Sequence, residues 1–326
     1  MAIIAMTMVA TSSCHSRKDK QDAAAGDSTA RIDIAFCEDS AMASIKTQCA
    51  FGPRTLGSEA HARCADYIEQ AFKAQGLEVS RQNTTFTLYN KESYEGCNII
   101  ARYTAADANA DRIMVCAHWD SRPWADADPD EKNHRTPVSA ANDGASGVAV
   151  MIELARQLRL HKAPVNVDFV CFDAEDAGVP DWETAFQGEE EDTWCLGSQY
   201  WAQHPHATDI RFAILLDMVG GKGARFYKER FSMAMAPGVQ TLVWENAKTA
   251  GYAAMFPDEV GGYITDDHLP INRIARIPCV DIIAYNPNSE QGFPATWHTL
   301  QDTPAHIDPT TLKAVGQTLI QVIYGY

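Results

Sequence analysis

Two kinds of segment alternate along the chain. In one kind the apolar residues have the spacing of a helix, and the other kind consists of short runs rich in strand-forming residues. Residues 58–75 carry apolar side chains three and four positions apart, which predicts a helix with Ser58 as N-cap and Gly76 as stop. Further helices are predicted over residues 148–160, 238–250 and 309–324. Short β-rich runs predict strands, which are residues 98–103, 112–117, 165–172, 212–216 and 280–284.

This alternation favours an α/β domain with helices on both faces of a central sheet. Residues 36–326 contain neither an internal repeat nor a linker, so one domain is expected. Two stretches break the rhythm, residues 121–139 and the acidic residues 178–194. Long loops in compact domains tend to carry function, so both are candidate functional segments, and calcium binding by the acidic one stays open.

The first 14 residues differ from the rest of the chain. An apolar run ends in small residues at Cys14 and is followed at once by charged residues such as Arg17 and Lys18. This pattern is typical of a secretory signal, and the cysteine resembles the acylated residue of a bacterial lipobox. We therefore expect residues 1–14 to be a signal peptide with a lipobox and residues 15–35 a flexible tether. A lipid-anchored periplasmic protein is expected, with plain secretion or a structural first segment as alternatives.

Charge and composition exclude several classes of partner. The chain has 27 Lys and Arg against 43 Asp and Glu, a formal charge of −16, which disfavours nucleic acids and anionic membrane surfaces as ligands. No apolar run is long enough to span a bilayer. Membrane contact is therefore expected only through the N-terminal lipid.

The nine cysteines show no CxxC spacing, so neither a zinc ribbon nor a thioredoxin-like motif is predicted. Cys37 and Cys49 flank a short segment, and both a disulfide and two free thiols remain open for them. Four others lie in apolar runs and are expected to be buried thiols, namely Cys97, Cys116, Cys171 and Cys279.

Polar side chains directly follow three of the predicted strands, where open α/β sheets bind ligands. These side chains are His118, Asp120, Glu175, Asp176 and Asp217. Asp143 opens a predicted helix among small residues that allow close backbone approach, and His298 follows the last strand after a loop. Taken alone, Asp143 is equally explained as a helix cap and His298 as an ordinary loop histidine.

The convergence of these residues is more informative than any one of them. Five carboxylates and two histidines at one rim of a sheet would repel one another and be costly to desolvate without a cation among them. Carboxylate and imidazole together suit zinc. The sequence therefore predicts a zinc site at the carboxyl edge of the sheet.

The order of these motifs resembles that of the co-catalytic zinc aminopeptidases, from about Glu95 to the C-terminus. The motifs are His118-x-Asp120, Asp143 in an Asp-Gly-Ala-Ser-Gly context, Glu175-Asp176, Leu196-Gly197-Ser198-Gln199, Asp217-Met218, Asp267-His268 and His298-Thr299-x-x-Asp302. The resemblance implies a single domain with a mixed central sheet.

Within that clan, three features resemble the glutaminyl-peptide cyclotransferases of the animal type and their bacterial relatives. Asp266 stands where the aminopeptidases usually have serine, Trp297 precedes His298 with Phe293 four residues earlier, and a long insertion contains Trp182. The cyclotransferases convert the N-terminal glutamine of peptides to pyroglutamate and release ammonia. The resemblance implies one zinc per chain and peptides or proteins with N-terminal glutamine as substrates.

Specific roles follow from the resemblance. Asp143, Asp176 and His298 would hold the zinc and leave a fourth position open, and Glu175 would be the general acid and base. Trp297, Phe293 and Trp182 would form an apolar pocket around the glutamine side chain, although Trp297 and Trp182 could instead belong to the aromatic core. We also expect the protein to act as a monomer.

The number of metal ions depends on a pair of carboxylates. The aminopeptidases hold a second zinc with the residues that match His118, Asp143 and Asp217, and all three types persist here. We hypothesise that Asp266 faces Asp217, shares a proton with it and binds the leaving nitrogen, because two adjacent carboxylates do not easily both ionise. A second metal or a supporting role remains open for His118, Asp120, Asp267 and His268.

Two departures from the animal enzymes are visible, Asp281 where they have a histidine behind the site and Asp176 where glutamate is commoner. A zinc aminopeptidase is the alternative function, and a non-catalytic peptide-binding domain on the same scaffold is the second alternative. The histidines outside the motifs are expected at the surface, namely His15, His61, His134, His161, His204, His206 and His306.

Overall fold

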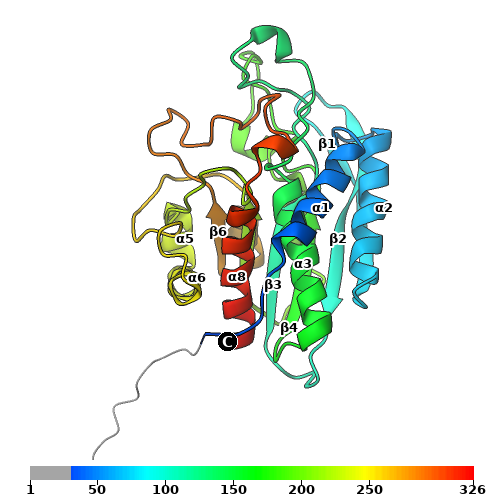
Figure 1. Cartoon of the computed structure of the whole chain (residues 1–326). Helices are drawn as coiled ribbons and strands as arrows, with labels where there is room; N and C mark the ends of the chain where they lie inside the picture. The colour runs from blue at the N-terminus through cyan, green and yellow to red at the C-terminus, as the bar shows by residue number, and fades with distance from the viewer. Residues whose placement is uncertain (1–30) are drawn as a thin grey trace, which may run out of the picture.

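A mixed six-stranded sheet runs through the computed structural model, which describes residues 31–326 (Figure 1). The strand order is β1-β2-β4-β3-β5-β6. The first two strands in this order, β1 and β2, are antiparallel to their neighbours, whereas β4, β3, β5 and β6 are parallel to one another. The strands are β1 Glu78–Thr87, β2 Ser93–Tyr103, β3 Arg112–His118, β4 Asn166–Phe172, β5 Ile210–Asp217 and β6 Cys279–Ile283. The expected single α/β domain with a mixed sheet is thus confirmed.

Helices cover both faces of the sheet, and successive side chains of a strand point alternately into the two layers. Ile113 and Val115 of β3 belong to the larger apolar core, whereas Met114 and Cys116 point into the smaller one. The larger layer contains α1 Glu38–Ala50, α2 Glu59–Lys73, α3 Ala145–His161, α6 Pro237–Ala250 and α8 Pro309–Gly325, and Figure 1 shows several of them in front of the sheet. The smaller layer contains α4 Leu196–Gln203 and α7 His268–Pro270, and the short α5 Arg230–Met235 packs near β6.

The predicted elements are all present, and the prediction of Ser58 as N-cap of α2 is confirmed. Its side chain accepts a hydrogen bond of 3.0 Å from the backbone N–H of His61. The sequence missed β1 and the helices α1, α4, α5 and α7. In β1 only one side chain, Phe86, is buried, because an edge strand covered on part of one face needs few apolar residues. Its polar composition therefore hides the strand from a pattern search.

The small residues at the start of α3 allow the helix to begin directly against the strands, as expected. A Cβ atom on Gly147 would lie 2.4 Å from the carbonyl oxygen of Leu216 and 2.7 Å from the Cβ of Ala117. Gly144 has a φ of +100°, and a Cβ there would lie 2.7 Å from the carbonyl oxygen of Asp120. Asp143 is thereby held at the ends of β3 and β5.

The folded body extends further toward the N-terminus than the sequence indicated. Ile32 and Gln321 of α8 exchange two hydrogen bonds of 3.0 Å, and the Gln317 side chain donates to the Ile34 carbonyl at 2.7 Å. Figure 1 shows this segment beside α8. The tether predicted for residues 15–35 is therefore wrong for residues 31–35, which are docked. The rest of the tether and the lipobox at residues 1–14 lie outside the described residues.

The open question on Cys37 and Cys49 is settled by α1. Cys37 is the N-cap of this helix and Cys49 lies in its last turn. Twelve positions along an α-helix correspond to about 18 Å, whereas a disulfide joins Cα atoms roughly 4.4–6.8 Å apart. Both thiols are free, and the four cysteines expected in the core are buried.

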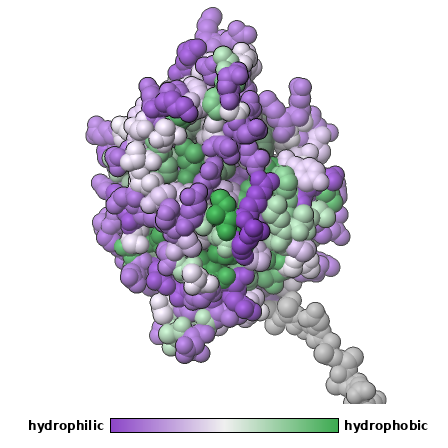
Figure 2. Space-filling model, turned by 180° about the vertical axis from the view of Figure 1, so that it is seen from behind, coloured by the Kyte–Doolittle hydropathy of each residue, from purple (hydrophilic) through white to green (hydrophobic). Residues whose placement is uncertain are grey.

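The outer surface agrees with the acidic, polar composition. Figure 2, which shows the molecule from behind, has hydrophilic residues over most of the face and hydrophobic ones in separate patches. Among residues 31–326, no helix is both long and apolar enough to cross a membrane.

Candidate active site

The carboxyl ends of the parallel strands bring the predicted polar residues together. His118 is the last residue of β3 and Asp217 the last of β5, while Glu175 and Asp176 follow β4. Asp143 lies directly before Gly144, the N-cap of α3, and His298 joins them from the loop before α8. All six side chains are buried. The predicted convergence at this edge of the sheet is therefore present.

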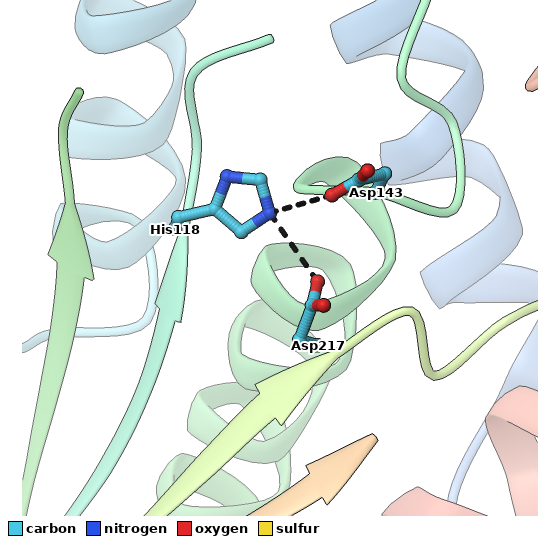
Figure 3. Close-up of side chains that lie close together, drawn as sticks. All are labelled: His118, Asp143 and Asp217. Carbon is cyan, nitrogen blue, oxygen red and sulfur yellow. Dashed lines mark hydrogen bonds and ion pairs between the residues drawn. The ribbon is translucent and has the colours of Figure 1, made fainter. Parts of the chain in front are cut away.

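His118 lies between two of the carboxylates, as Figure 3 shows. Its Nε2 is 3.0 Å from Oδ1 of Asp143 and 3.3 Å from Oδ1 of Asp217, and its Nδ1 is 3.4 Å from Oδ1 of Asp120. Burial lowers the pKa of His118, but the hydrogen bonds to Asp120, Asp143 and Asp217 outweigh it and raise the pKa well above its usual value. The imidazole thus compensates charge in the cluster.

A second group of donors surrounds His298. Its Nε2 lies 3.0 Å from Oδ1 of Asp176 and 3.7 Å from Oδ2 of Asp143. One donor atom from each of Asp143, Asp176 and His298 lies within 4.8 Å of the others. Burial, together with the charges of Asp176 and Asp217, raises the pKa of Asp143 to about 7. Asp143 is thus short of positive charge, whereas for Asp176 burial is outweighed by the nearby His298, which lowers the pKa.

These residues fit a zinc ion. The second carboxylate oxygen of Asp176, Oδ2, is buried and has no hydrogen-bond partner among the described residues, so it has a lone pair available for a metal. Two carboxylates and one imidazole are a donor set that zinc accepts, and three protein ligands leave a position for substrate. Asp143, Asp176 and His298 could therefore hold the metal.

A second set of donors shares Asp143. One donor atom from each of His118, Asp143 and Asp217 also lies within 4.8 Å of the others. Asp266 lines a pocket together with Asp143 and Asp217. Its pKa is well above the usual value because it is buried and because Asp217 and Asp267 are close. Oδ1 of Asp266 accepts a hydrogen bond from the N–H of Asp267, and its buried Oδ2 has no partner among the described residues, so the proton shared with Asp217 stays a prediction.

Asp120 orders the backbone that carries Glu175 and Asp176. Its Oδ1 accepts a hydrogen bond from the N–H of Glu175, and its Oδ2 accepts one from the N–H of Asp176, both at 3.1 Å. Burial raises the pKa of Glu175 well above its usual value, and the charge of Asp176 adds to the effect. The thiol of Cys195 lies 3.3 Å from Oε1 of Glu175. Glu175 is therefore a buried carboxyl that binds a proton strongly.

Sequence reasoning missed Arg122 and Asp126, which lie in the predicted functional loop of residues 121–139. Asp126 Oδ1 is 3.4 Å from Nδ1 of His298, and its carboxylate forms a buried ion pair with Arg122. Arg122 also donates to the carbonyl of Asp176 at 3.0 Å and stacks 4.4 Å above the ring of Trp194. The only sequence signal for them was the length of the loop.

The donors open into a pocket of about 260 Å³ with aromatic walls. Phe293 and Trp297 line it as predicted, with ring centroids 4.6 Å apart, and Trp297 stacks 3.7 Å from the ring of His298. Trp182 does not line this pocket, which corrects the prediction. It packs instead against Trp124 and under the guanidinium of Arg135, in an aromatic cluster formed by the outer loops.

The lining position expected for Trp182 belongs to Trp194. Its ring stacks 5.9 Å from that of His298, at an interplanar angle of 8°. Both tryptophans belong to the same inserted loop, so the sequence identified the right segment and the wrong residue.

Asp267 and His268 support the site from behind. The pKa of Asp267 is raised to about 7 by burial, against a hydrogen bond from Ser198. His268 Nε2 is 3.2 Å from Glu229 Oε2, and His268 Nδ1 is 3.8 Å from Asp281 Oδ2. None of these side chains lines the pocket.

Some histidines outside the motifs are not at the surface, contrary to expectation. His61 is buried, its Nε2 lies 2.8 Å from Oδ1 of Asp173, and its ring stacks on Trp119. His206 is partly buried and lies 2.8 Å from Oδ2 of Asp168. The partner of His206 lies within β4 and that of His61 directly follows this strand, pairings that no local sequence pattern predicts. His15 lies outside the described residues.

Comparisons with known proteins agree with this geometry. The model of "Peptidase family M28" matches residues 98–323. The chain is 25% identical over 256 residues to the mouse glutaminyl-peptide cyclotransferase-like protein, a match that covers 70% of this chain and 60% of the relative. It therefore spans less than two thirds of that curated relative.

Two crystal structures from Bacteroides thetaiotaomicron are more similar. A glutaminyl cyclase bound to N-acetylhistamine is 46% identical with a TM-score of 0.85, and the match covers 89% of this chain and 98% of that one. A protein described as a leucine aminopeptidase precursor is 46% identical with a TM-score of 0.84 and the same coverage. The names of these relatives thus include both a cyclase and a peptidase.

Proposed function

The chain belongs to peptidase family M28, and from this premise we propose that it is a zinc-dependent glutaminyl-peptide cyclotransferase. It converts the N-terminal glutamine of peptides and proteins to pyroglutamate and releases ammonia. The observation that carries the proposal is the pocket of about 260 Å³, in which Glu175 and Asp266 meet the zinc-type donors beneath the rings of Trp297 and Phe293. The similarity to the bacterial glutaminyl cyclase supports it.

One zinc ion per chain is held by Asp143, Asp176 and His298. When bound, it supplies Lewis-acid polarisation of the glutamine side-chain amide. His118 stays near Asp143 and Asp217 and balances their charge.

Glu175 moves the proton that the reaction requires. The substrate's α-amine, with a pKa of about 7.7–8.0, is partly neutral near pH 7 and attacks the carboxamide carbon (Cδ) of its own side chain. Glu175 takes a proton from the attacking nitrogen and returns it to the departing one, so that a new C–N bond forms, the amide C–N bond breaks and ammonia leaves. Its raised pKa, caused first by burial and then by Asp176, suits it to both steps.

The aromatic walls and the carboxyl pair orient the glutamine. Trp194, Phe293 and Trp297 hold the side chain folded against its own amine, which supplies the proximity that cyclisation needs. Asp266 and Asp217 share a proton and bind the leaving amide nitrogen.

A zinc aminopeptidase is the second candidate, and the donor set His118, Asp143 and Asp217 favours it. A second metal there would turn the site into a two-metal centre. A non-catalytic peptide-binding domain would be expected to lack a ligand or the base, whereas all of these residues are present.

A single assay separates the three functions. The protein is incubated with Gln-β-naphthylamide and with Leu-p-nitroanilide, with and without a zinc chelator. Chelator-sensitive ammonia release from the glutamine substrate alone supports the cyclotransferase. Release of nitroaniline would favour the aminopeptidase, and no reaction with either substrate would favour a binding domain.

We further propose that the protein is periplasmic and anchored by a lipid on Cys14, which the sequence pattern of residues 1–14 supports. Expressed in a Gram-negative bacterium, the full chain is expected in the membrane fraction. The Cys14→Ala variant is expected to leave that fraction, and an unchanged distribution would contradict the anchor.

A further inference from the structure

The pocket is small for a substrate that is a peptide. Its volume of about 260 Å³ lies below the roughly 300–1,000 Å³ of sites that enclose a drug-sized ligand. If it holds the N-terminal glutamine, the second residue of the peptide has to lie on the rim. The side chains of the rim therefore contact whatever follows the glutamine.

Tyr263 is an exposed aromatic residue on that rim. It lines the pocket, and yet 67% of its surface is accessible to solvent, the largest value among the exposed large hydrophobic residues that the structure describes. An aromatic ring with a free face beside a binding pocket is a typical contact surface for an apolar side chain.

Neighbouring groups hold this ring in place before any ligand arrives. It packs against Phe231 with centroids 4.8 Å apart, and the guanidinium of Arg230 lies 5.5 Å from the ring centroid. Arg273 lies in turn 5.2 Å above the ring of Phe231 and pairs with Glu191 of the inserted loop. The ring therefore lies at one end of a continuous series of contacts that reaches Glu191 of the inserted loop.

The backbone on either side of Tyr263 is also fixed. The N–H of Arg230 donates to the carbonyl of Gly262 at 3.0 Å, and the N–H of Ile264 donates to Oε1 of Glu229 at 3.3 Å. Binding against a ring that is already ordered loses little conformational entropy. Contact with Tyr263 therefore stabilises a bound peptide at a small cost in conformational entropy.

We propose that Tyr263, supported by Phe231, forms the subsite for the second residue of the substrate and selects an aromatic or large apolar side chain there. The inference rests on the proposed cyclotransferase function, and it adds a specificity that the zinc donors and Glu175 do not provide. A side chain of glycine size at the second position leaves the ring exposed, whereas phenylalanine covers it.

The test compares two peptides that differ only at the second residue, Gln-Phe-Ala-amide and Gln-Gly-Ala-amide. The wild-type protein is expected to have a higher kcat/KM for the phenylalanine peptide. Tyr263→Ala is expected to reduce the ratio of the two kcat/KM values about threefold to tenfold, the magnitude of one aromatic pair. Tyr263→Phe keeps the ring and the ratio. Leu160→Ala, which removes another exposed apolar side chain, at the end of α3, is the matched control.

The outcomes are distinguishable. Cyclisation with equal kcat/KM for both peptides, or an unchanged ratio in Tyr263→Ala, would overturn the subsite and leave the cyclotransferase intact. No ammonia from either peptide would overturn the proposed function and the subsite with it. Inhibition of the wild-type protein by the two reaction products tests the subsite without any variant. Stronger inhibition by pyroglutamyl-Phe-Ala-amide than by pyroglutamyl-Gly-Ala-amide would support it. Equal inhibition by the two products would contradict the subsite.

Discussion

Oδ1 of Asp126 lies 3.4 Å from Nδ1 of His298, on the side of the imidazole that faces away from the pocket. Burial raises the pKa of Asp126, but hydrogen bonds from His298 and Arg122 outweigh it and hold this pKa well below the usual range. The ionised carboxylate holds a proton of His298 on Nδ1, so that Nε2, which faces Asp176 and Asp143, is the nitrogen that would bind a metal. Carboxylates in this position commonly orient a metal-binding histidine.

Replacement of Asp126 with asparagine is expected to weaken zinc binding about 10- to 100-fold, because the amide no longer fixes the orientation and basicity of His298. Competition with a fluorescent zinc chelator measures the affinity directly. Asp130→Asn is the matched control, since Asp130 is in the same loop and only bonds locally to the N–H of Lys132. Equal zinc affinity in both variants would show that Asp126 does not orient the ligand.

Glu175→Gln is expected to reduce kcat for cyclisation by about 10² to 10⁴, because glutamine cannot accept a proton from the α-amine. Zinc binding should persist, since Glu175 is not among the three proposed ligands. Steady-state ammonia release and metal content of the same purified sample check both statements. A fully active variant would refute the assigned base, and loss of zinc would place Glu175 among the ligands.

The sequence predicted the parts of this site that strand ends create and missed the parts that loops create. His118, Glu175 and Asp217 were found because the parallel strands of a sheet end at one edge. Asp126 reaches His298 only through the path of an irregular loop, which no periodicity reveals. The choice of Trp182 over Trp194 failed for the same reason.

The fold, too, was predicted only where a local pattern in the sequence reveals it. Buried strands and amphipathic helices leave a clear hydrophobic pattern, whereas β1 does not, because only Phe86 of this edge strand is buried. Buried polar pairs such as His61 with Asp173 were also out of reach, since the two partners are 112 positions apart in the chain.

Cys195 is expected to be a positioning residue for Glu175, because its thiol lies 3.3 Å from Oε1 of that carboxyl. Cys195→Ala should lower kcat about threefold to tenfold with little change in KM, which is the effect of one lost hydrogen bond. Cys195→Ser should restore most of kcat, since the hydroxyl donates in the same place. Cys49→Ala, a partly buried thiol in α1, is the control. If alanine and serine behave alike, the thiol only fills space.

The zinc content distinguishes two roles of Asp217, which either shares a proton with Asp266 or binds a second zinc ion. If Asp266 and Asp217 share a proton, the site at His118, Asp143 and Asp217 has too little negative charge to hold a second ion tightly. We expect one zinc per chain by elemental analysis after dialysis, and Asp266→Ser should allow a second one to bind. Two tightly held zinc ions in the wild-type protein, together with aminopeptidase activity, would contradict the proposed function.

The metal-free protein is expected to lose stability as the pH rises from about 5 to 8. Burial, followed by the charges of Asp176 and Asp217, raises the pKa of Asp143 from 3.8 to about 7. Burial lowers the pKa of His298, but Asp176 and Asp126 outweigh it and raise the value from 6.5 to about 9. In this pH range the folded state therefore binds more protons than the unfolded state, and the free energy of unfolding decreases as protons are lost.

Zinc should reverse this trend, because the metal replaces the missing protons as the positive charge among the carboxylates. Each proton of difference corresponds to about 1.4 kcal/mol per pH unit, so urea unfolding of the chelator-treated protein at pH 5.5 and pH 8 can measure the slope. The gain in unfolding free energy on addition of zinc should be larger at pH 8. Asp143→Asn, which removes one of the titrating groups, should flatten the slope of the metal-free protein. A metal-free protein that is more stable at pH 8 than at pH 5.5 would show that the cluster is not short of positive charge.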